Sequence, residues 1–277
     1  MTELLALGSA LSFGSGDFLG GSAGRLAAPI KVTAVMHTVS LILVPVLLVT
    51  MGSASPTVSD LLWGAGGGLF GLAGGFSLVT ALARGPMSIV APTTGVLSAA
   101  IPVGYALATG ERPGAVTLIG VVLGLTAIVI VSGADGPSGR LSGAVLGASL
   151  AAGLGFGLFF IFFAQTSEAA GMWPVLGARL VSVPVVLAAA WRLGGTKPTG
   201  RAGRLSVGPG VLDTAGNALY LAAAQRGLLT VASTLSALYP AVTAVIARFA
   251  LHERMSAFQR VGVLIALMAV VLIGWPR

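Results

Sequence analysis

The stretches GERPGAVTLIG (110–120) and HERMSAFQRVG (252–262) are two copies of one pattern, and this pattern decides how the chain is organised. In both copies a Glu-Arg pair is followed eight residues later by a glycine, and the copies stand 142 positions apart. Charged residues make up only 8% of the chain, so charges that match at a fixed offset are more informative than matching apolar residues. A repeat of about half the chain length has to be interpreted before any local pattern.

The repeat continues upstream of these stretches. The same offset pairs Arg84-Gly85 with Arg226-Gly227, and several glycines and alanines before them pair likewise. Nearer the start the offset slips to 139, a shift that short loops tolerate. The sequence therefore predicts two versions of one unit, residues 1–133 and 143–277, joined by a loop at 134–142.

The composition indicates a membrane protein. Of the 277 residues, 56% are hydrophobic and 8% are charged, whereas a soluble domain carries roughly a quarter charged residues. The chain has no cysteine, which excludes disulfides and thiolate metal sites. Its net charge of +7 is dispersed over short loops, which favours attraction to anionic lipid headgroups over nucleic-acid binding.

Ten apolar segments are long enough to be membrane helices, which need about 20 mostly apolar residues each. Five helices in each repeat is an odd number, so the second repeat starts on the opposite side of the membrane and the two must be inverted. The predicted fold class is therefore an all-α membrane protein of ten transmembrane helices in two inverted five-helix repeats. The expected helices are 3–21, 32–51, 60–82, 88–109, 114–132, 143–164, 173–191, 207–225, 230–250 and 257–275.

The repeat unit resembles the EamA family of the drug/metabolite transporter superfamily. A glycine-rich third helix ends in Ala-Arg-Gly-Pro (83–86) or Gln-Arg-Gly-Leu (225–228), and the fourth closes on Gly-Glu-Arg or His-Glu-Arg. The resemblance covers nearly the whole chain and implies a central cavity, transport of small metabolites, often by export of amino acids, and cytoplasmic termini. The positive-inside rule predicts the opposite orientation, because the odd-numbered loops hold most of the basic residues, so the orientation stays open.

Asp17 is the first candidate functional residue, because an ionisable side chain inside a membrane helix is costly and is a functional candidate by default. It is expected to carry a proton or cation, or to contact a substrate amine; the alternative is a solvated residue at the helix boundary. Phe13, on the same helix, is a candidate for an apolar cavity wall. His37 is interpreted as a boundary histidine that reaches the lipid headgroups.

Three polar residues follow one face of the predicted helix 207–225. Asp213, Asn217 and Tyr220 are spaced i, i+4, i+7, so they lie on the same side of a helix. A polar stripe in lipid should face protein or water, and we expect it to line the cavity; hydrogen bonding between helices is the alternative.

Tyr239, in the fourth helix of the second repeat, completes the predicted cavity. Pro240 beside it, and Pro102 in the first repeat, are expected to kink their helices, because an internal proline removes a hydrogen bond. Arg179 is interpreted as snorkelling toward the membrane boundary, with a substrate-carboxylate role as the alternative.

The sequence thus predicts a secondary transporter that moves a small metabolite by alternating access. The resemblance to the EamA family implies that this metabolite is an amino acid or a related compound and that it moves in the export direction. The alternative is a non-transporting membrane scaffold or receptor. No hydrolase or kinase constellation and no phosphate-binding loop is present, so neither an enzyme nor a cofactor is expected, and no metal site either. The expected partners are a small-molecule substrate and the lipid bilayer, with protons as a candidate coupling ion, and the expected location is the cytoplasmic (inner) membrane, as a multi-pass protein.

Overall fold

The structure is a computed structural model, and it describes most of the chain. Glu111 and Arg112 of the first repeated stretch, most of the connecting loop, and most of the first half of the expected helix 230–250 lie outside the described residues. The described residues are 2–51, 55–110, 114–133, 141–195, 198–226, 236, 238–273 and 275.

Within these ranges the protein is entirely helical, with ten α-helices and one short 3-10 helix, and the predicted fold class is confirmed. The first repeat holds α1 (Thr2–Gly24), α2 (Pro29–Met51), α3 (Val58–Arg84), α4 (Met87–Ala108) and α5 (Ala115–Gly133). The second holds α6 (Gly143–Phe163), the 3-10 helix η1 (Glu168–Ala170), α7 (Trp173–Arg192), α8 (Gly200–Arg226), α10 (Tyr239–Ala250) and α11 (Ala257–Ile273).

Most helices begin and end within a few residues of the expected positions, but α8 does not. It begins at Gly200 rather than at 207, so part of the polar stretch 192–206 is helical and carries Arg201 and Arg204 on its first turns. Arginine has a high helix propensity, and a polar first turn can extend beyond the apolar layer into water. The polar composition that marked a loop in the sequence therefore marks the protruding end of a helix.

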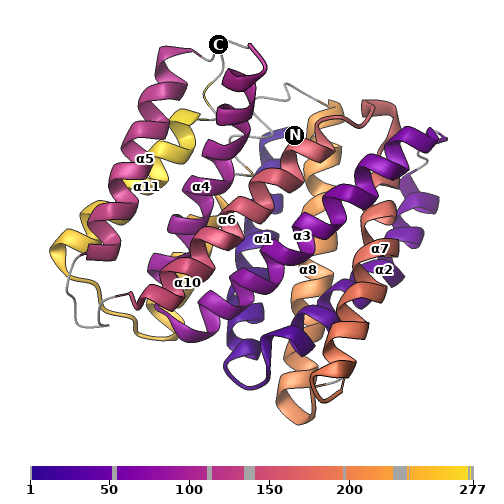
Figure 1. Cartoon of the computed structure of the whole chain (residues 1–277), viewed down its shortest axis with the longest axis horizontal. Coiled ribbons are helices and arrows are strands. Elements are labelled where there is room, and N and C mark those ends of the chain that lie inside the picture. The colour runs from indigo at the N-terminus through magenta and orange to yellow at the C-terminus, as the bar shows by residue number, and fades with distance from the viewer. Residues whose placement is uncertain are drawn as a thin grey trace.

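Five of the ten helices are long and apolar enough by themselves to cross a membrane: α2, α3, α4, α6 and α7. The apolar parts of α5, α10 and α11 in the described residues are shorter, at 10–17 residues. All ten helices nevertheless pack in one bundle, in which α5 and α11 form the left side of Figure 1 and α2, α7 and α8 form the right side.

The helix contacts repeat with the two halves exchanged, as a two-fold relation requires. The first helix of one repeat packs on the third of the other, both as α1 on α8 and as α6 on α3. Likewise α2 packs on α8 while α7 packs on α3, and the pairs α2–α7, α5–α11 and α4–α10 pack on each other. Because each repeat has five helices, this two-fold axis lies in the membrane plane.

Glycine permits the closest of these approaches. A Cβ atom added to Gly155 of α6 would lie 2.7 Å from Cα of Gly74 in α3, and one added to Gly68 of α3 would lie 2.5 Å from the carbonyl oxygen of Ala178 in α7. Side chains cannot occupy such gaps, so the small residues let the backbones meet. The glycine-rich α3 is thus a packing surface between the repeats.

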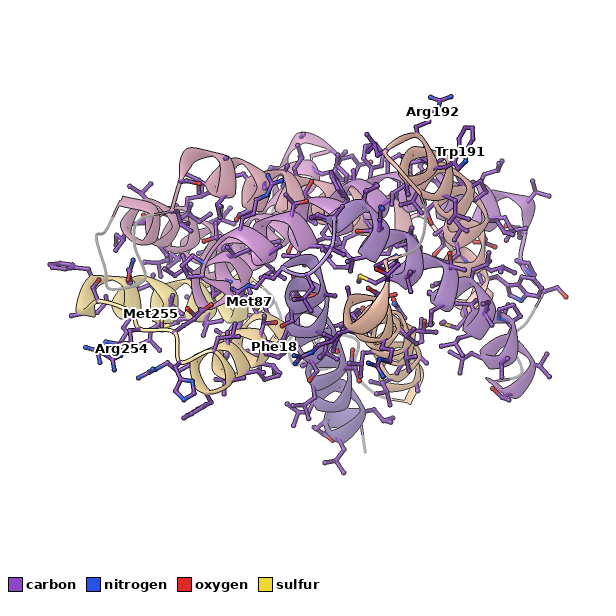
Figure 2. All side chains as sticks on the ribbon, turned by 90° about the horizontal axis from the view of Figure 1, so that it is seen from below. Phe18, Met87, Trp191, Arg192, Arg254 and Met255 are labelled. Atoms are coloured by element: carbon purple, nitrogen blue, oxygen red, sulfur yellow. The ribbon has the colours of Figure 1, made fainter. Side chains whose placement is uncertain are left out.

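A second join between the repeats lies at the ends of α1 and α4. Met87, at the start of α4, is fully buried, and Phe18 of α1 and Met255 of the α10–α11 connection pack in the same apolar cluster (Figure 2). The outer rim is different: Trp191 and Arg192 project from the end of α7 (Figure 2). We call the end of the bundle formed by the α1–α2, α3–α4, α7–α8 and α10–α11 connections the basic face, because it carries Arg25, Arg84, Arg192 and Arg254.

Candidate functional site

Arg179 is the centre of a buried polar network between α2, α7 and α8. It is only 9% exposed, and its planar guanidinium donates in three fixed directions. Nε donates to Ser40 Oγ at 2.9 Å, Nη1 lies 3.3 Å from His37 Nδ1, and Nη2 forms an ion pair with Asp213 Oδ2 at 2.6 Å. The interpretation of Arg179 as a snorkelling residue is therefore wrong, because its partners on α2 and α8 hold it in the interior.

The network follows the two-fold relation of the repeats. His37 of α2 and Arg179 of α7 stand 142 positions apart, as do Ser40 and Ser182. The contacts are exchanged in the same way: Arg179 bonds to Ser40, and His37 Nδ1 lies 2.9 Å from Ser182 Oγ. The offset of the repeated stretch would have paired these residues from the sequence alone, but α2 and α7 otherwise match weakly.

His37 acts as an acceptor in this network. Arginine has no acceptor atom, so Nδ1 of His37 must present its lone pair to Arg179, and Ser182 can donate to the same atom. The ring proton then belongs on Nε2, on the side of Gly75 in α3. His37 is buried, so its interpretation as a boundary residue among lipid headgroups is wrong.

Asp17 of α1 lies beside this network without belonging to it. Its Oδ2 is buried and has no hydrogen-bond partner in the described part of the chain. The carboxyl group is near enough to Asp213 and Tyr239 to interact with both electrostatically. A buried acceptor without a donor costs about 1–3 kcal/mol, more when charged, so a proton or a cationic group would supply a partner that the described residues do not.

Phe13 and Tyr239 form the aromatic side of this region. Phe13 is one helical turn before Asp17, on the same face of α1, and its ring meets that of Tyr239 edge to face with centroids 6.3 Å apart. The side chain of Tyr239 is also hydrogen-bonded to that of Ser98 in α4. The site therefore draws on the first helix of one repeat and the fourth helices of both.

The polar stripe of α8 divides along its length. Asp213 turns to Arg179, while Asn217 Nδ2 donates to the carbonyl oxygen of Asp213 within its own helix at 2.8 Å. Tyr220 packs near Ala6 and Ala223, toward the start of α1. All three polar side chains are half-buried. The structure thus brings Asp213 to Arg179 and Asp17, and it leaves Asn217 and Tyr220 one and two turns away.

The two prolines have different positions. Pro102 lies inside α4, where its effect on the helix axis stays a prediction. Pro240 lies in the first turn of α10, which begins at Tyr239, so it starts a helix and does not kink its interior. A proline in the first turn removes no intrahelical hydrogen bond, because the N–H it lacks would have had no partner there.

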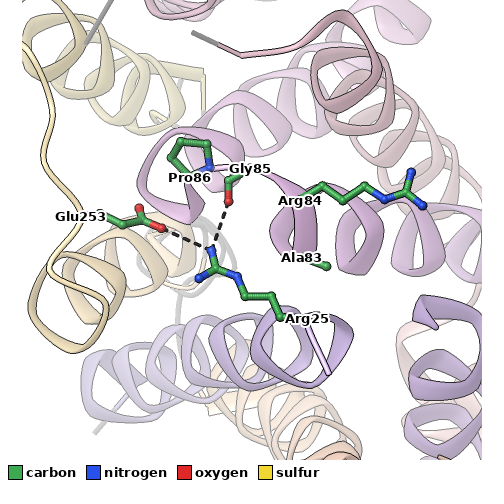
Figure 3. A pocket seen from close by; sticks show the side chains of 6 residues that line it. All are labelled: Arg25, Ala83, Arg84, Gly85, Pro86 and Glu253. Carbon is green, nitrogen blue, oxygen red and sulfur yellow. Dashed lines mark hydrogen bonds and ion pairs between the residues drawn. The ribbon is translucent and has the colours of Figure 1, made fainter. Parts of the chain in front are cut away.

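At the basic face, Glu253 joins the second repeat to the first. Its carboxylate accepts from the backbone N–H groups of Met87 and Ser88, both at 2.9 Å, and from Ser88 Oγ at 2.6 Å, so it caps the N-terminus of α4. Arg25 lies 3.5 Å from Glu253 Oε1 and donates to the carbonyl oxygen of Gly85 at 3.2 Å (Figure 3). Glu253 therefore caps a helix of the other repeat.

These contacts surround a shallow, open pocket in which the Arg84 side chain points away from Arg25 (Figure 3). Among the described residues no three His, Asp or Glu side chains come together as metal ligands. The chemistry available at the centre of the bundle is therefore that of one arginine, one histidine, two carboxylic acids and two aromatic rings.

Comparison with known proteins agrees with the two-repeat plan. The sequence profile of the EamA-like transporter family matches the chain twice, over residues 1–133 and 142–275. A solved structure titled only "Crystal structure of protein" superposes with a TM-score of 0.64 at 18% sequence identity, over 98% of this chain and 95% of that chain. This second likeness shows the fold alone. The comparison with curated proteins gave no match.

Proposed function

Since the chain belongs to the EamA-like transporter family, whose members are membrane transporters of small solutes and not enzymes, we propose that it is a secondary transporter of an amino acid or a related compound. The two repeats would alternate access to a site between them, in the export direction. The membrane would be the cytoplasmic (inner) membrane, which the chain crosses several times.

One observation carries this proposal: the buried, unpartnered Oδ2 of Asp17, placed where the two repeats meet. Asp17 is on α1 of the first repeat, and the residues around it, Asp213 and Tyr239, belong to the second. A ligand bound there contacts both halves at once, so binding and the movement of the halves are linked. A proton bound to Asp17 would couple transport to a pH gradient in the same place.

The half-burial of the surrounding side chains supports a site that a solute can reach. Phe13, Asn217, Tyr220 and Tyr239 are half-buried, and so is Asp17 as a whole residue, although its Oδ2 is buried. Residues that hold the fold alone would be expected to be buried like Arg179 and His37. Cavity lining by Asn217 and Tyr220 is accordingly part of the proposal.

The test is uptake by proteoliposomes that contain the purified protein. A screen of amino acids and small amines, with and without a pH gradient, should identify solutes that enter faster than into empty vesicles. Asp17→Asn keeps the size of the side chain, removes the charge and should lose the uptake. If no solute moves above the background of empty vesicles under either condition, the protein is better described as a non-transporting scaffold or receptor.

A further inference from the structure

When Asp17 is ionised, the formal charges at the centre of the bundle add up to a single negative charge. Two carboxyl groups lie there, Asp17 and Asp213, and Asp213 is neutralised by Arg179 at 2.6 Å. His37 accepts from Arg179 and therefore adds no positive charge, and Tyr239 is a phenol bonded to Ser98. Among the titratable groups of the described chain that face Asp17, none carries a further charge that is not neutralised by a partner.

Arg179 is fixed in a way that keeps Asp213 occupied. Ser40 and His37 hold the other two edges of its guanidinium, so the group cannot turn away from Asp213 without losing both contacts. The side chain of Asp213 is still 35% exposed, so its carboxylate would become available if the arginine were removed. Arg179 thus determines how many negative charges a ligand meets.

The surroundings of the remaining carboxylate favour an organic cation. Phe13 stands one turn from Asp17 on the same face of α1, and Tyr239 meets its ring edge to face. Aromatic faces attract ammonium groups as well as apolar carbon, and they do so more strongly where water is excluded. The buried Oδ2 of Asp17, which lacks a donor, and the rings of Phe13 and Tyr239 together suit a ligand that carries an ammonium group on an apolar carbon skeleton.

We infer that Asp17, Phe13 and Tyr239 form a binding site for one singly charged ammonium group, and that Arg179 restricts the site to a single positive charge by neutralising Asp213. This is the site of the proposed function, and the idea that the bound ammonium compound is also transported rests on that function. Binding itself is independent of transport and can be measured without it.

The experiment uses the full-length purified protein in detergent and a matched pair of probes, 1-aminobutane and 1,4-diaminobutane. They share a four-carbon chain and carry one and two positive charges at neutral pH. Affinities are measured by equilibrium dialysis for the wild type, Asp17→Asn, Asp213→Asn, Arg179→Gln and the double variant Arg179→Gln/Asp213→Asn. The four variants set the formal charge of the site to 0, 0, −2 and −1.

We expect the wild type to prefer the monoamine, and Asp17→Asn to bind neither probe. Asp213→Asn should weaken the monoamine by about tenfold, because it frees the arginine charge. Arg179→Gln should raise the affinity for the diamine relative to the monoamine by about tenfold or more. The double variant should return this ratio toward that of the wild type, which protects the test against a folding defect of either single variant.

Three results would overturn the inference: no monoamine binding by the wild type, binding unaffected by Asp17→Asn, or a diamine preference that does not change with the charge of the site. The proposed function fails separately. If proteoliposomes transport no solute while the binding pattern holds, the site stands and the transport proposal falls. If a solute is transported while the amines do not bind, the transport proposal stands and the proposed ammonium site falls.

Discussion

The two repeats have the same arrangement of helices but different side chains at the positions that meet in the middle. Where the second repeat has Arg179 and Asp213, the first has His37 and Gly71, at the offset of 142. Where the first has Asp17, the second has Phe156, at the offset of 139. The contacts that obey the two-fold relation, Ser40 with Arg179 and Ser182 with His37, fasten α2 to α7.

This difference separates scaffold from chemistry. Residues whose contacts are exchanged between the repeats are buried and satisfied, as expected for parts that hold the halves in register. The acids have no counterpart at the related positions, and one of them has an unsatisfied oxygen. A site that recognises one solute in one orientation needs such asymmetry, whereas a symmetric scaffold does not. Substitutions in the symmetric scaffold and in the asymmetric site should therefore have different effects.

The largest effect is expected from the unsatisfied acid. Asp17→Asn should lower solute uptake by about tenfold or more, because a charged hydrogen bond contributes about 1.5–3 kcal/mol. The measurement is the initial rate in proteoliposomes across a range of pH. Phe156→Leu changes the related position in the other repeat without touching a charge, and it should transport normally. Wild-type rates for Asp17→Asn at every pH would show that the Asp17 carboxyl group takes no part in transport.

The ion pair of Arg179 with Asp213 should contribute more to stability than the neutral hydrogen bonds of His37, the residue related to Arg179 in the first repeat. Arg179→Gln should lower the free energy of unfolding by about 2 kcal/mol, reduced from the full cost of breaking a buried pair because Asp213 is partly exposed. His37→Gln should cost about 1 kcal/mol, the loss of neutral hydrogen bonds. The measurement is denaturation in detergent. Equal costs for the two variants would show that the ion pair adds nothing to the symmetric contacts.

The sequence predicted the scaffold better than the chemistry, for a physical reason. A repeat is visible in sequence because the same helices pack in the same way twice, and so the ten helices could be predicted. The ion pair of Arg179 with Asp213 joins residues of α7 and α8 that share no local pattern, and only packing brings them together. A charged residue in an apolar helix looks the same in sequence whether it snorkels or meets a distant partner.

Pro240 shows a related limit. A proline in an apolar stretch of helical length predicts a kink, but the chain can also end one helix and begin another there. Helix α10 begins at Tyr239. A run of apolar residues does not show whether a helix begins at such a proline or bends there. Tyr239 lies beside Phe13, so the position at which α10 begins determines part of the site.

The joins at the two ends of the bundle provide a smaller effect. At the basic face Glu253 caps α4, and at the other end Asp60 accepts from the backbone N–H of Ser167 at 2.7 Å. Both cross the repeat boundary, and among the residues that the structure describes Glu253 has a basic partner, Arg25, while Asp60 has none. If the halves rock, Glu253→Gln should favour opening of the basic face about fivefold, the equivalent of about 1 kcal/mol.

This opening can be measured by labelling, because the chain has no cysteine of its own. Ala83→Cys places a reporter in the pocket beside Arg25 and Glu253. In this background Glu253→Gln should speed labelling by a water-soluble maleimide, while Asp60→Asn, at the opposite end, should slow it or leave it unchanged. Faster labelling from both variants to the same extent would indicate general loosening and would contradict rocking between two closed ends.

The smallest effect is expected from the two polar residues of α8 that the ion pair leaves out. The related residues in the first repeat are Gly75 and Leu78, so Asn217 and Tyr220 are again polar on one side only. One amide hydrogen of Asn217 is already used within α8, and Tyr220 lies two turns from Asp213, so neither can contribute as much as Asp17. Asn217→Ala and Tyr220→Phe should each weaken solute affinity by about threefold, the loss of one modest neutral hydrogen bond.

Both variants should be produced at normal yield and melt within a few degrees of the wild type. A packing role gives the opposite pattern, with lower yield or melting temperature and unchanged affinity in the protein that survives. Ser182→Ala is the matched comparison, because Ser182 belongs to the symmetric scaffold and should follow the packing pattern. If all three variants behave alike, the division between a symmetric scaffold and an asymmetric site does not extend along α8.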